Sequence, residues 1–432
     1  MGGNMYIGDP SSNWGSDSPT GSYAAEAEGL TVVKNNFYAN LLKGFFTMGT
    51  VAFGANYRPA DGSMVLSVGG NAQTWNGVKV QGVGISGNGD YQGQIGGDGP
   101  TRVWGQDAST STQSASVYRY DYGTEYPQEK VYWGSSAAQS LSVNGTDYST
   151  YGITISTLSS QLDALSTTGT TTLGTAPADS TYAKYKYDGK VKASFAIAAG
   201  AEKLITFAGN DSSKLQVFQV KASDLASHAP STGLDFAFTG IPDGASVIVN
   251  VVNGDGTPYK GTVDFQQGWR FWWNGAEISN GYVEAGATDA VTDAMRSAYT
   301  AASQSIMWNY SGATSVDIKG SQATKISGSV DKASSSDPGW SQFSDATVTD
   351  DPSSAVLGSI LVPGGNLTTH VTTNGRVWVG GNYAMLNTSN VKQGSEDIVF
   401  GTSKSASIVD MDQERHNLPW SASLTSSCST IS

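Results

Sequence analysis

Short runs of β-branched and other apolar residues recur along this chain, and the same turn closes each of them. The segments Met64–Asn71, Val356–Asn366 and Thr373–Asn382 all end in Gly-Gly-Asn. The last two copies lie about one solenoid coil apart. Short strands that end in glycine and asparagine turns favour a chain that coils and stacks strand on strand. Surfaces built in this way typically hold or display a partner and do not convert a substrate.

Further strand-type runs, separated by turn residues, fill much of the second half. Asp243-Gly244 and Asn253-Gly254 supply the positive φ that tight turns need. The clearest strand-type runs in this half are Lys203–Ala208, Leu215–Val220, Leu234–Phe238, Val247–Val252, Ile306–Tyr310 and Thr314–Ile318. Residues 1–30 and 421–432 are polar and are predicted to be irregular ends.

Two segments have the periodicity of a helix. In the first, apolar residues recur at i, i+3, i+7 and i+10 and mark one helical face, formed by Ile155, Leu158, Leu162 and Leu165. The second helix is predicted over Thr288–Ser303, where Asp289 could cap the first turn. Its apolar face would comprise Val291, Met295, Ala298 and Ala302.

Charge excludes several classes of partner. The formal net charge is −13 with a pI of about 4.6, and nucleic-acid binding needs clustered lysine and arginine. The same balance disfavours anionic membranes, and no apolar run reaches membrane-spanning length. We therefore expect no nucleic acid and no membrane as partners. The single cysteine, Cys428, provides neither a disulfide framework nor a cysteine metal site.

The chain opens on Met1-Gly2-Gly3, without the charged and apolar regions of a signal peptide. Both ends stop abruptly in polar sequence, which predicts a segment of a longer protein. One cysteine suits the cytosol, and it suits equally a bacterial surface protein that does not rely on disulfides.

Five short segments stand in a distinctive order: Val217–Leu225, Ile241–Val251, Ile306–Tyr310, Gly358–Pro363 and Glu414–Trp420. Each is weak alone, but together they resemble the choice-of-anchor A domain of bacterial cell-surface proteins. The resemblance extends over residues 200–420 and reaches the amino-terminal part through the helix predicted at 155–165 and the segment Val68–Asn71. It implies a secreted, wall-anchored protein, such as an adhesin carried at a pilus tip. No sortase signal accompanies it.

The segments Gly358–Leu361 and Gly375–Val377 are also similar to the closing coils of ice-binding β-solenoid proteins. This similarity, together with the spacing of the Gly-Gly-Asn runs, implies an all-β fold. We expect a right-handed, β-helix-like β-solenoid with one or two flanking helices, and a β-sandwich is the alternative. Because no linker divides the chain, residues 1–432 are predicted to form a single elaborated adhesin-type domain with an insertion at about 98–190.

Three histidines, His228, His370 and His416, share no metal-ligand spacing, so no metal site is predicted. His416 stands two residues after Glu414 in the closing segment of the family-like pattern. A buried imidazole paired with a carboxylate needs no catalytic role to explain it. We therefore expect this pair to form a structural hydrogen bond.

The densest aromatic cluster is Trp269–Trp273, and it contains a candidate ligand site. Side chains alternate across a strand, so Arg270 and Trp272 would share one face and Trp269 the other. If the first face is exposed, Arg270 and Trp272 form a stacking and hydrogen-bonding pair suited to a glycan or a peptide side chain. Packing of the whole cluster in the core is the competing interpretation.

A tyrosine-rich stretch provides a second candidate. Tyr118, Tyr120 and Tyr122 would lie on one side of a strand, with Arg119 and Asp121 on the other. Tyrosine supplies large, rigid contact area at low entropic cost, which recognition surfaces exploit. A tyrosine ladder that only covers a sheet explains the same pattern.

Catalytic signatures are absent from the sequence. It has no Ser-His-Asp order, no glycine-rich phosphate loop and no Cys-His pair. Glu277 and Glu284 are the best available carboxylates for a glycosidase-like pair, but they carry no motif. We predict no enzymatic activity, no catalytic residues and no cofactor.

These observations predict an extracellular bacterial adhesin domain on the cell surface. We expect it to bind a host extracellular-matrix protein, mucin or glycan, at the tip of a pilus or on a wall-anchored protein. Other pilus or cell-wall subunits would be further partners. Two alternatives stay open: a structural spacer that binds no ligand, and a polysaccharide-acting β-solenoid enzyme. Ice binding is a weaker alternative, because it needs flat, regular threonine arrays that the sequence does not clearly show.

Overall fold

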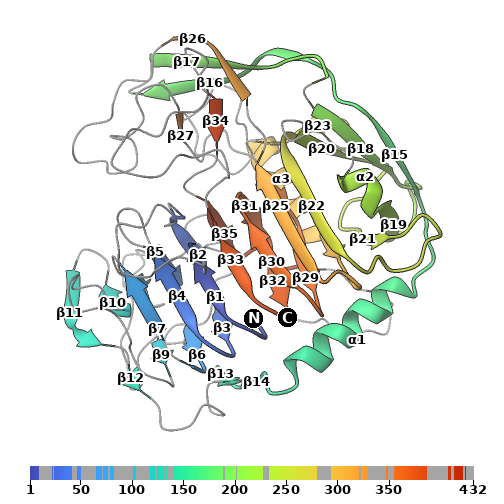
Figure 1. Ribbon diagram of the computed structural model, residues 1–432. Helices are drawn as coiled ribbons and strands as arrows, with labels where there is room; N and C mark the ends of the chain where they lie inside the picture. The colour runs from blue at the N-terminus through green and yellow to red at the C-terminus, as the bar shows by residue number, and fades with distance from the viewer. Residues whose placement is uncertain are drawn as a thin grey trace.

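The computed structural model (Figure 1) covers the sequence with gaps. It describes residues 1–8, 22, 24–40, 46–49, 65–70, 72–75, 78–81, 101–103, 117–121, 124–130, 132–133, 141–187, 190–200, 202–226, 233–279, 293–320, 323–328, 347–348, 355–386, 407–409, 413–421 and 424.

An 11-stranded sheet forms the longest face of the molecule. In spatial order its strands are β15 (Thr170–Thr175), β18 (Glu202–Ala208), β20 (Gly233–Thr239), β22 (Thr262–Trp273), β25 (Ser315–Gly320), β30 (Asn366–Thr369), β33 (Tyr383–Met385), β1 (Met5–Ile7), β4 (Phe37–Asn40) and β7 (Ala72–Trp75). The short β23 (Ala276–Glu277) pairs with β22. Every neighbouring pair from β18 to β7 is parallel.

An eight-stranded sheet forms the second face. It contains, in order, β11 (Thr124–Lys130), β10 (Val117–Asp121), β8 (Val78–Gln81), β5 (Phe46–Gly49), β2 (Glu26–Glu28), β35 (Glu414–His416), β31 (Thr372–Asn374) and β28 (Ala355–Leu357). Only the β10–β11 pair in this sheet is antiparallel.

The third face is divided between two parallel sheets. One contains β12 (Tyr132–Trp133), β9 (Thr101–Val103), β6 (Leu66–Val68) and β3 (Thr31–Val33). The other contains β19 (Leu215–Lys221), β21 (Ser246–Val252), β24 (Ile306–Asn309), β29 (Ser359–Val362) and β32 (Val377–Val379).

The remaining elements flank these faces. A five-stranded sheet has the order β16 (Asp179–Tyr187), β17 (Lys190–Ile197), β26 (Ala323–Gly328), β34 (Ser407–Val409) and β27 (Thr347–Val348). A hairpin joins β13 (Ser142–Val143) to β14 (Thr146–Asp147). The helices are α1 (Tyr151–Asp163), α2 (Ala222–Ala226) and α3 (Asp293–Ser305).

Successive strands visit the three faces in turn, so that β31, β32 and β33 form one coil and β1, β2 and β3 form another. The fold is mostly β, with stacked parallel sheets and few helices, and this arrangement is consistent with the predicted β-solenoid. Parallel pairing favours it over the alternative β-sandwich, whose sheets are antiparallel.

The coils do not stack in sequence order. The first strand, β1, lies between β33 and β4, and β2 lies between β35 and β5. The amino-terminal coils therefore continue the stack that the carboxy-terminal coils begin, and the first strand, β1, and the last, β35, both lie in its middle (Figure 1). Met5–Ile7 and Glu26–Glu28 thus form strands inside the range that we predicted to be irregular.

A corner built from Gly-Gly-Asn joins the two sets of coils. The backbone N–H of Asn382 donates to Asn366 Oδ1 at 2.8 Å, that of Asn4 to Asn382 Oδ1 at 2.8 Å, and that of Asn36 to Asn4 Oδ1 at 2.9 Å. The N–H of Gly3 also donates to the carbonyl of Gly381 at 2.8 Å. Gly2-Gly3-Asn4 is a further copy of the repeat that sequence analysis missed.

Glycine at these corners has a steric cause. A Cβ atom at Gly380 would collide with the carbonyl oxygen of Pro363 in the coil below, and one at Gly381 would collide with Asn366 Oδ1. The stacked corners therefore approach too closely for any side chain. Gly364, in the same repeat, has open space around it.

Aromatic rings fill one end of the interior. Phe207, Phe238 and Trp273 occupy one register row of the long sheet, and Phe207 and Phe238 stack with ring centroids 4.6 Å apart. Trp308 of β24 meets Phe236 across the core at 5.0 Å. The indole N–H of Trp308 donates to the carbonyl of Leu357 at 2.8 Å.

The first predicted helix is confirmed as α1, which packs on the outer face of the β19–β32 sheet. Ile155, Leu158 and Leu162 are buried there, and Leu165 packs beside them. Polar side chains fix the contact, because Ser159 Oγ donates to Asn309 Oδ1 at 2.6 Å and Asn309 Nδ2 donates to Asn250 Oδ1 at 2.8 Å.

The second predicted helix corresponds to α3, which begins at Asp293. Met295 and Ala298 pack against the core, and Ala302 is buried. The proposed cap Asp289 and the face residue Val291 lie outside the described residues. Strands β9 to β12, which belong to the stacked sheets, lie within the range predicted to be an insertion, as does α1.

Replacement of Gly380 by alanine should lower the free energy of unfolding by about 1–3 kcal/mol, because the corner must open to admit the methyl group. Gly364→Ala is the matched control and should change it by less than about 0.5 kcal/mol. Urea unfolding followed by tryptophan fluorescence measures both. Equal stability of the two variants would show that the corners do not stack this closely.

Candidate functional site

The Trp269–Trp273 cluster lies on β22, at a point where the strand bulges. Leu234 of β20 pairs with Gln267 and Phe236 pairs with Phe271, so a step of two residues on β20 faces a step of four on β22. The bulge turns backbone amides toward two carboxylates. The N–H of Trp269 donates to Glu202 Oε1, and the N–H of Arg270 donates to Asp235 Oδ1, both at 3.0 Å.

Arg270 completes this buried polar cluster. Its Nε lies 3.1 Å from Asp235 Oδ2 and a terminal nitrogen lies 3.4 Å from Glu202 Oε2, while the other donates to the carbonyl of Pro177 at 2.6 Å. Arg270 and Glu202 are each 2% exposed. Burial, and then the charge of Glu202, raises the pKa of Asp235 well above its usual range. One guanidinium thus balances two carboxylates, one of which favours its protonated form.

Arg270 lies beside Trp272 on the strand, with its guanidinium carbon 5.1 Å from the centre of the indole ring. Trp269 and Arg270 are buried, whereas Trp272 is half-buried and presents part of its ring at the surface. The guanidinium therefore supports the ring from below, and Trp272 is the member of the three that a ligand can reach.

The tyrosine stretch lies elsewhere. The backbones of Tyr118 and Tyr120 belong to β10, which pairs with β8 and β11 at the other end of the stack (Figure 1). Tyr122 lies outside the described residues. The structure therefore does not bring the two predicted groups together, and their roles as ligand contacts stay predictions.

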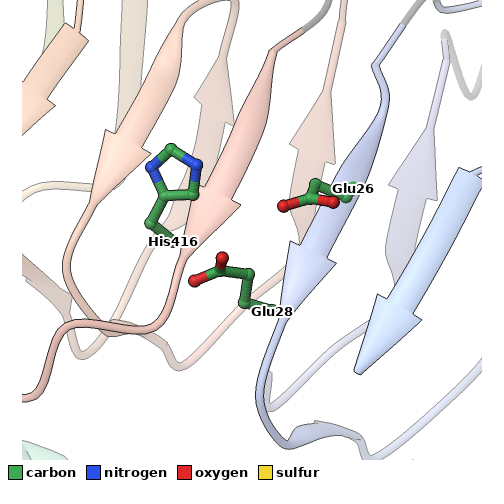
Figure 2. Close-up of side chains that lie close together, drawn as sticks. All are labelled: Glu26, Glu28 and His416. Atoms are coloured by element: carbon green, nitrogen blue, oxygen red, sulfur yellow. The ribbon is translucent and has the colours of Figure 1, made fainter. Parts of the chain in front are cut away.

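Three potential metal ligands converge between β2 and β35. Glu26 and Glu28 extend from one strand toward His416 on the next (Figure 2), with ligand atoms all within 4.8 Å of one another. However, His416 Nδ1 lies 2.7 Å from Asn374 Oδ1 and Nε2 lies 2.7 Å from Glu414 Oε2. Both ring nitrogens therefore donate to oxygen acceptors, which is the pattern of an imidazolium cation.

Electrostatics around His416 agree with that assignment. Burial opposes the charge, but the hydrogen bond to Glu414 and the negative charges of Glu28, Glu414 and Glu26 raise the pKa of His416 to about 9. The imidazolium occupies the place that a cation would take among these carboxylates. The predicted structural hydrogen bond between Glu414 and His416 is confirmed.

The candidate carboxylate pair for catalysis is not assembled in the described residues. Burial raises the pKa of Glu277, whose Oε1 accepts a hydrogen bond from Ser279 Oγ at 3.3 Å. Glu284 lies outside the described residues. Glu277 instead borders the polar cluster around Arg270, whose charge acts on it.

A cavity of about 400 Å³ was not foreseen from the sequence. It lies where the two sheets of the third face meet, between Val32 of β3 and Trp378 of β32, and the β13–β14 hairpin and the start of α1 line its outer side. Tyr151 of α1 anchors this cover, because its hydroxyl accepts the N–H of Val379 at 2.9 Å. Tyr148, Tyr151 and Trp378 give the cavity aromatic walls.

Comparison with known proteins gives one family. Residues 17–330 match the model of a family described as "Putative Ice-binding-like adhesive domain". No curated protein and no solved structure matches the chain. Among the residues that the structure describes, no helix has the length and apolarity required to cross a membrane.

The raised pKa of His416 predicts a pH-dependent stability. Because the folded-state pKa of about 9 exceeds the ordinary value of 6.5, the stabilisation is complete below about pH 6.5 and is lost as the pH rises to about 9. The loss is on the order of 3 kcal/mol. Chemical unfolding at pH 6.5 and pH 9 measures it.

His416→Gln should be less stable than the wild type at pH 6.5, and much of the difference should disappear at pH 9. Glu414→Gln removes the main hydrogen-bond acceptor and should reduce the same slope. A wild-type slope that survives in His416→Gln would contradict the imidazolium assignment.

Proposed function

We propose that this chain, which belongs to the ice-binding-like adhesive domain family, is an extracellular adhesin domain that binds a host matrix protein, mucin or glycan. The observation that carries the proposal is the match of residues 17–330 to that family. Membership in an adhesive family indicates a surface role that is non-enzymatic, and it implies a binding target. The bacterial origin, the host ligand and the position at a pilus tip or on a wall-anchored protein are the finer parts of the proposal.

The architecture supports a binding role. Stacked parallel strands, which we interpret as a β-solenoid, hold their outer side chains at fixed spacing because each strand is hydrogen-bonded on both sides. Rigid elements place ligand contacts more accurately than loops do. Deeply buried charged groups lie around Arg270 and His416. These groups form hydrogen bonds within the fold.

Two surfaces are proposed to contact the ligand. One is Trp272, which Arg270 supports from the buried cluster beside Trp269. The other is the tyrosine stretch Tyr118, Tyr120 and Tyr122, of which Tyr118 and Tyr120 belong to β10 at the opposite end of the stack. Two separate contact surfaces would let one domain engage an extended polymer such as mucin. Other pilus or cell-wall subunits are proposed as the partners that carry the domain.

A solid-phase assay against collagen, fibronectin, mucin and a glycan array tests the proposal. The intact protein should bind at least one of them above background. Trp272→Ala should weaken that binding by about tenfold, as expected for an interface hot spot. Ile153→Ala is the control, because Ile153 is 71% exposed on α1, away from both surfaces.

Folded protein that binds none of these ligands would contradict the proposal and favour a structural spacer. Release of reducing sugar ends from a polysaccharide, abolished by Glu277→Gln, would contradict it in favour of an enzyme.

A further inference from the structure

Positive charge gathers in the cavity at the junction of the third face. Arg376, Arg415 and the exposed Lys34 all line it. No aspartate or glutamate is among the described residues that line the cavity. The whole chain has 37 acidic and 24 basic residues, so a cavity whose charged lining side chains are all cationic runs against its overall charge.

Arg415 is held in the wall with part of its hydrogen-bonding capacity unused. It is 3% exposed, and a terminal nitrogen donates to the carbonyl of Glu28 and to Thr31 Oγ1, both at 2.8 Å. Within the described part of the chain, its Nε has no hydrogen-bond partner. The negative charge of Glu28 favours the protonated form of Arg415. The Oε2 atom of Glu28 is already engaged, because it accepts the N–H of Asn417 at 2.9 Å. A buried donor without an acceptor is unfavourable unless a ligand supplies one.

Arg376 adds a second charge at the same place. Its backbone N–H donates to Ser359 Oγ at 3.1 Å, but in the described residues no carboxylate forms a salt bridge with its guanidinium group. Burial lowers the pKa of both guanidinium groups, and the charge of Arg376 lowers that of Arg415 further. Two cations that repel each other across a cavity lose that repulsion when an anion lies between them.

The remaining walls indicate what carries the anion. Tyr148, Tyr151 and Trp378 offer flat apolar surface, and Thr146 and Ser149 place hydroxyl groups beside it. A volume of about 400 Å³ falls in the range of small-molecule pockets. A ring with an apolar face, several hydroxyl groups and one negative charge matches this combination of walls.

We propose that the cavity between β3, β32 and the β13–β14 hairpin binds an acidic sugar residue, one whose ring carries a carboxylate or a sulfate group. Arg376 and Arg415 would bind the anionic group, and the aromatic walls would pack against the ring. This inference rests on the proposed adhesive function and names the part of a host glycan that the domain recognises.

Isothermal titration calorimetry with free sugars tests the site directly. The probes are N-acetylneuraminic acid and glucuronic acid for the carboxylate, N-acetylglucosamine 6-sulfate for the sulfate, and uncharged N-acetylglucosamine as the neutral comparison. At least one acidic sugar should bind with an affinity that falls as salt is added, and the neutral sugar should bind at least about tenfold more weakly, since a charge-assisted contact is lost.

Variants localise the binding. Arg376→Gln should weaken the acidic sugar by about tenfold or more, and Lys34→Gln, on an exposed side chain, should weaken it to a smaller extent. Arg296→Gln is the matched control, because it removes one arginine charge from α3, where Arg296 pairs with the exposed Asp293. Unfolding curves of each variant establish that the fold is retained.

Three outcomes would overturn the inference. They are absence of binding by every acidic sugar, equal binding by Arg376→Gln and the wild type, and inorganic sulfate that binds as tightly as the sugars. If the wild type and Arg376→Gln still bind mucin or matrix protein equally in the solid-phase assay, the adhesive function stands and the pocket assignment alone fails. If neither assay detects binding, both fail.

Discussion

The hydrogen bonds at the Gly-Gly-Asn corner join the two ends of the chain into one stack. Asn382 accepts the N–H of Asn4 at a sequence separation of 378 residues, and Asn4 in turn accepts the N–H of Asn36. Each side-chain oxygen thereby satisfies a backbone donor that the turn would leave without a partner. Glycine directly before Asn4, Asn366 and Asn382 is required by the close approach of the coils. Without this corner, β1 and β33 would become open sheet edges in the middle of the molecule.

The same junction brings together two polar centres, one around His416 and one around Arg415. His416 bonds to Asn374 and Glu414 within the carboxy-terminal coils, and Glu26 and Glu28 of the amino-terminal coil add their negative charge to the same place. Arg415 likewise extends from β35 to the carbonyl of Glu28 and to Thr31. On the third face β3 and β32 belong to separate sheets, and the cavity opens between them. Closure of the stack and formation of the pocket are therefore one structural event.

Local features of the fold could be predicted from the sequence. The Gly-Gly-Asn repeat identifies the corners because only glycine fits there, and the spacing of Ile155, Leu158 and Leu162 identifies the buried face of α1. Alternation along β22 places Arg270 beside Trp272. The burial of Arg270 could not be predicted in this way, because its partners Asp235 and Glu202 come from neighbouring strands. The cavity could not be predicted from the sequence for the same reason, since its walls come from segments far apart in the chain. One signal was available: Gly2-Gly3-Asn4 repeats the corner motif and indicates where the first coil stacks.

Native-state amide hydrogen exchange at the junction tests its central role most directly. Met5–Ile7 of β1 and Tyr383–Met385 of β33 are paired in register, so their amides should be protected to the same extent and should exchange only when the whole stack unfolds. Rapid exchange of Met5–Ile7 while Tyr383–Met385 stays protected would contradict it, because the amino-terminal coils would then open independently of the rest.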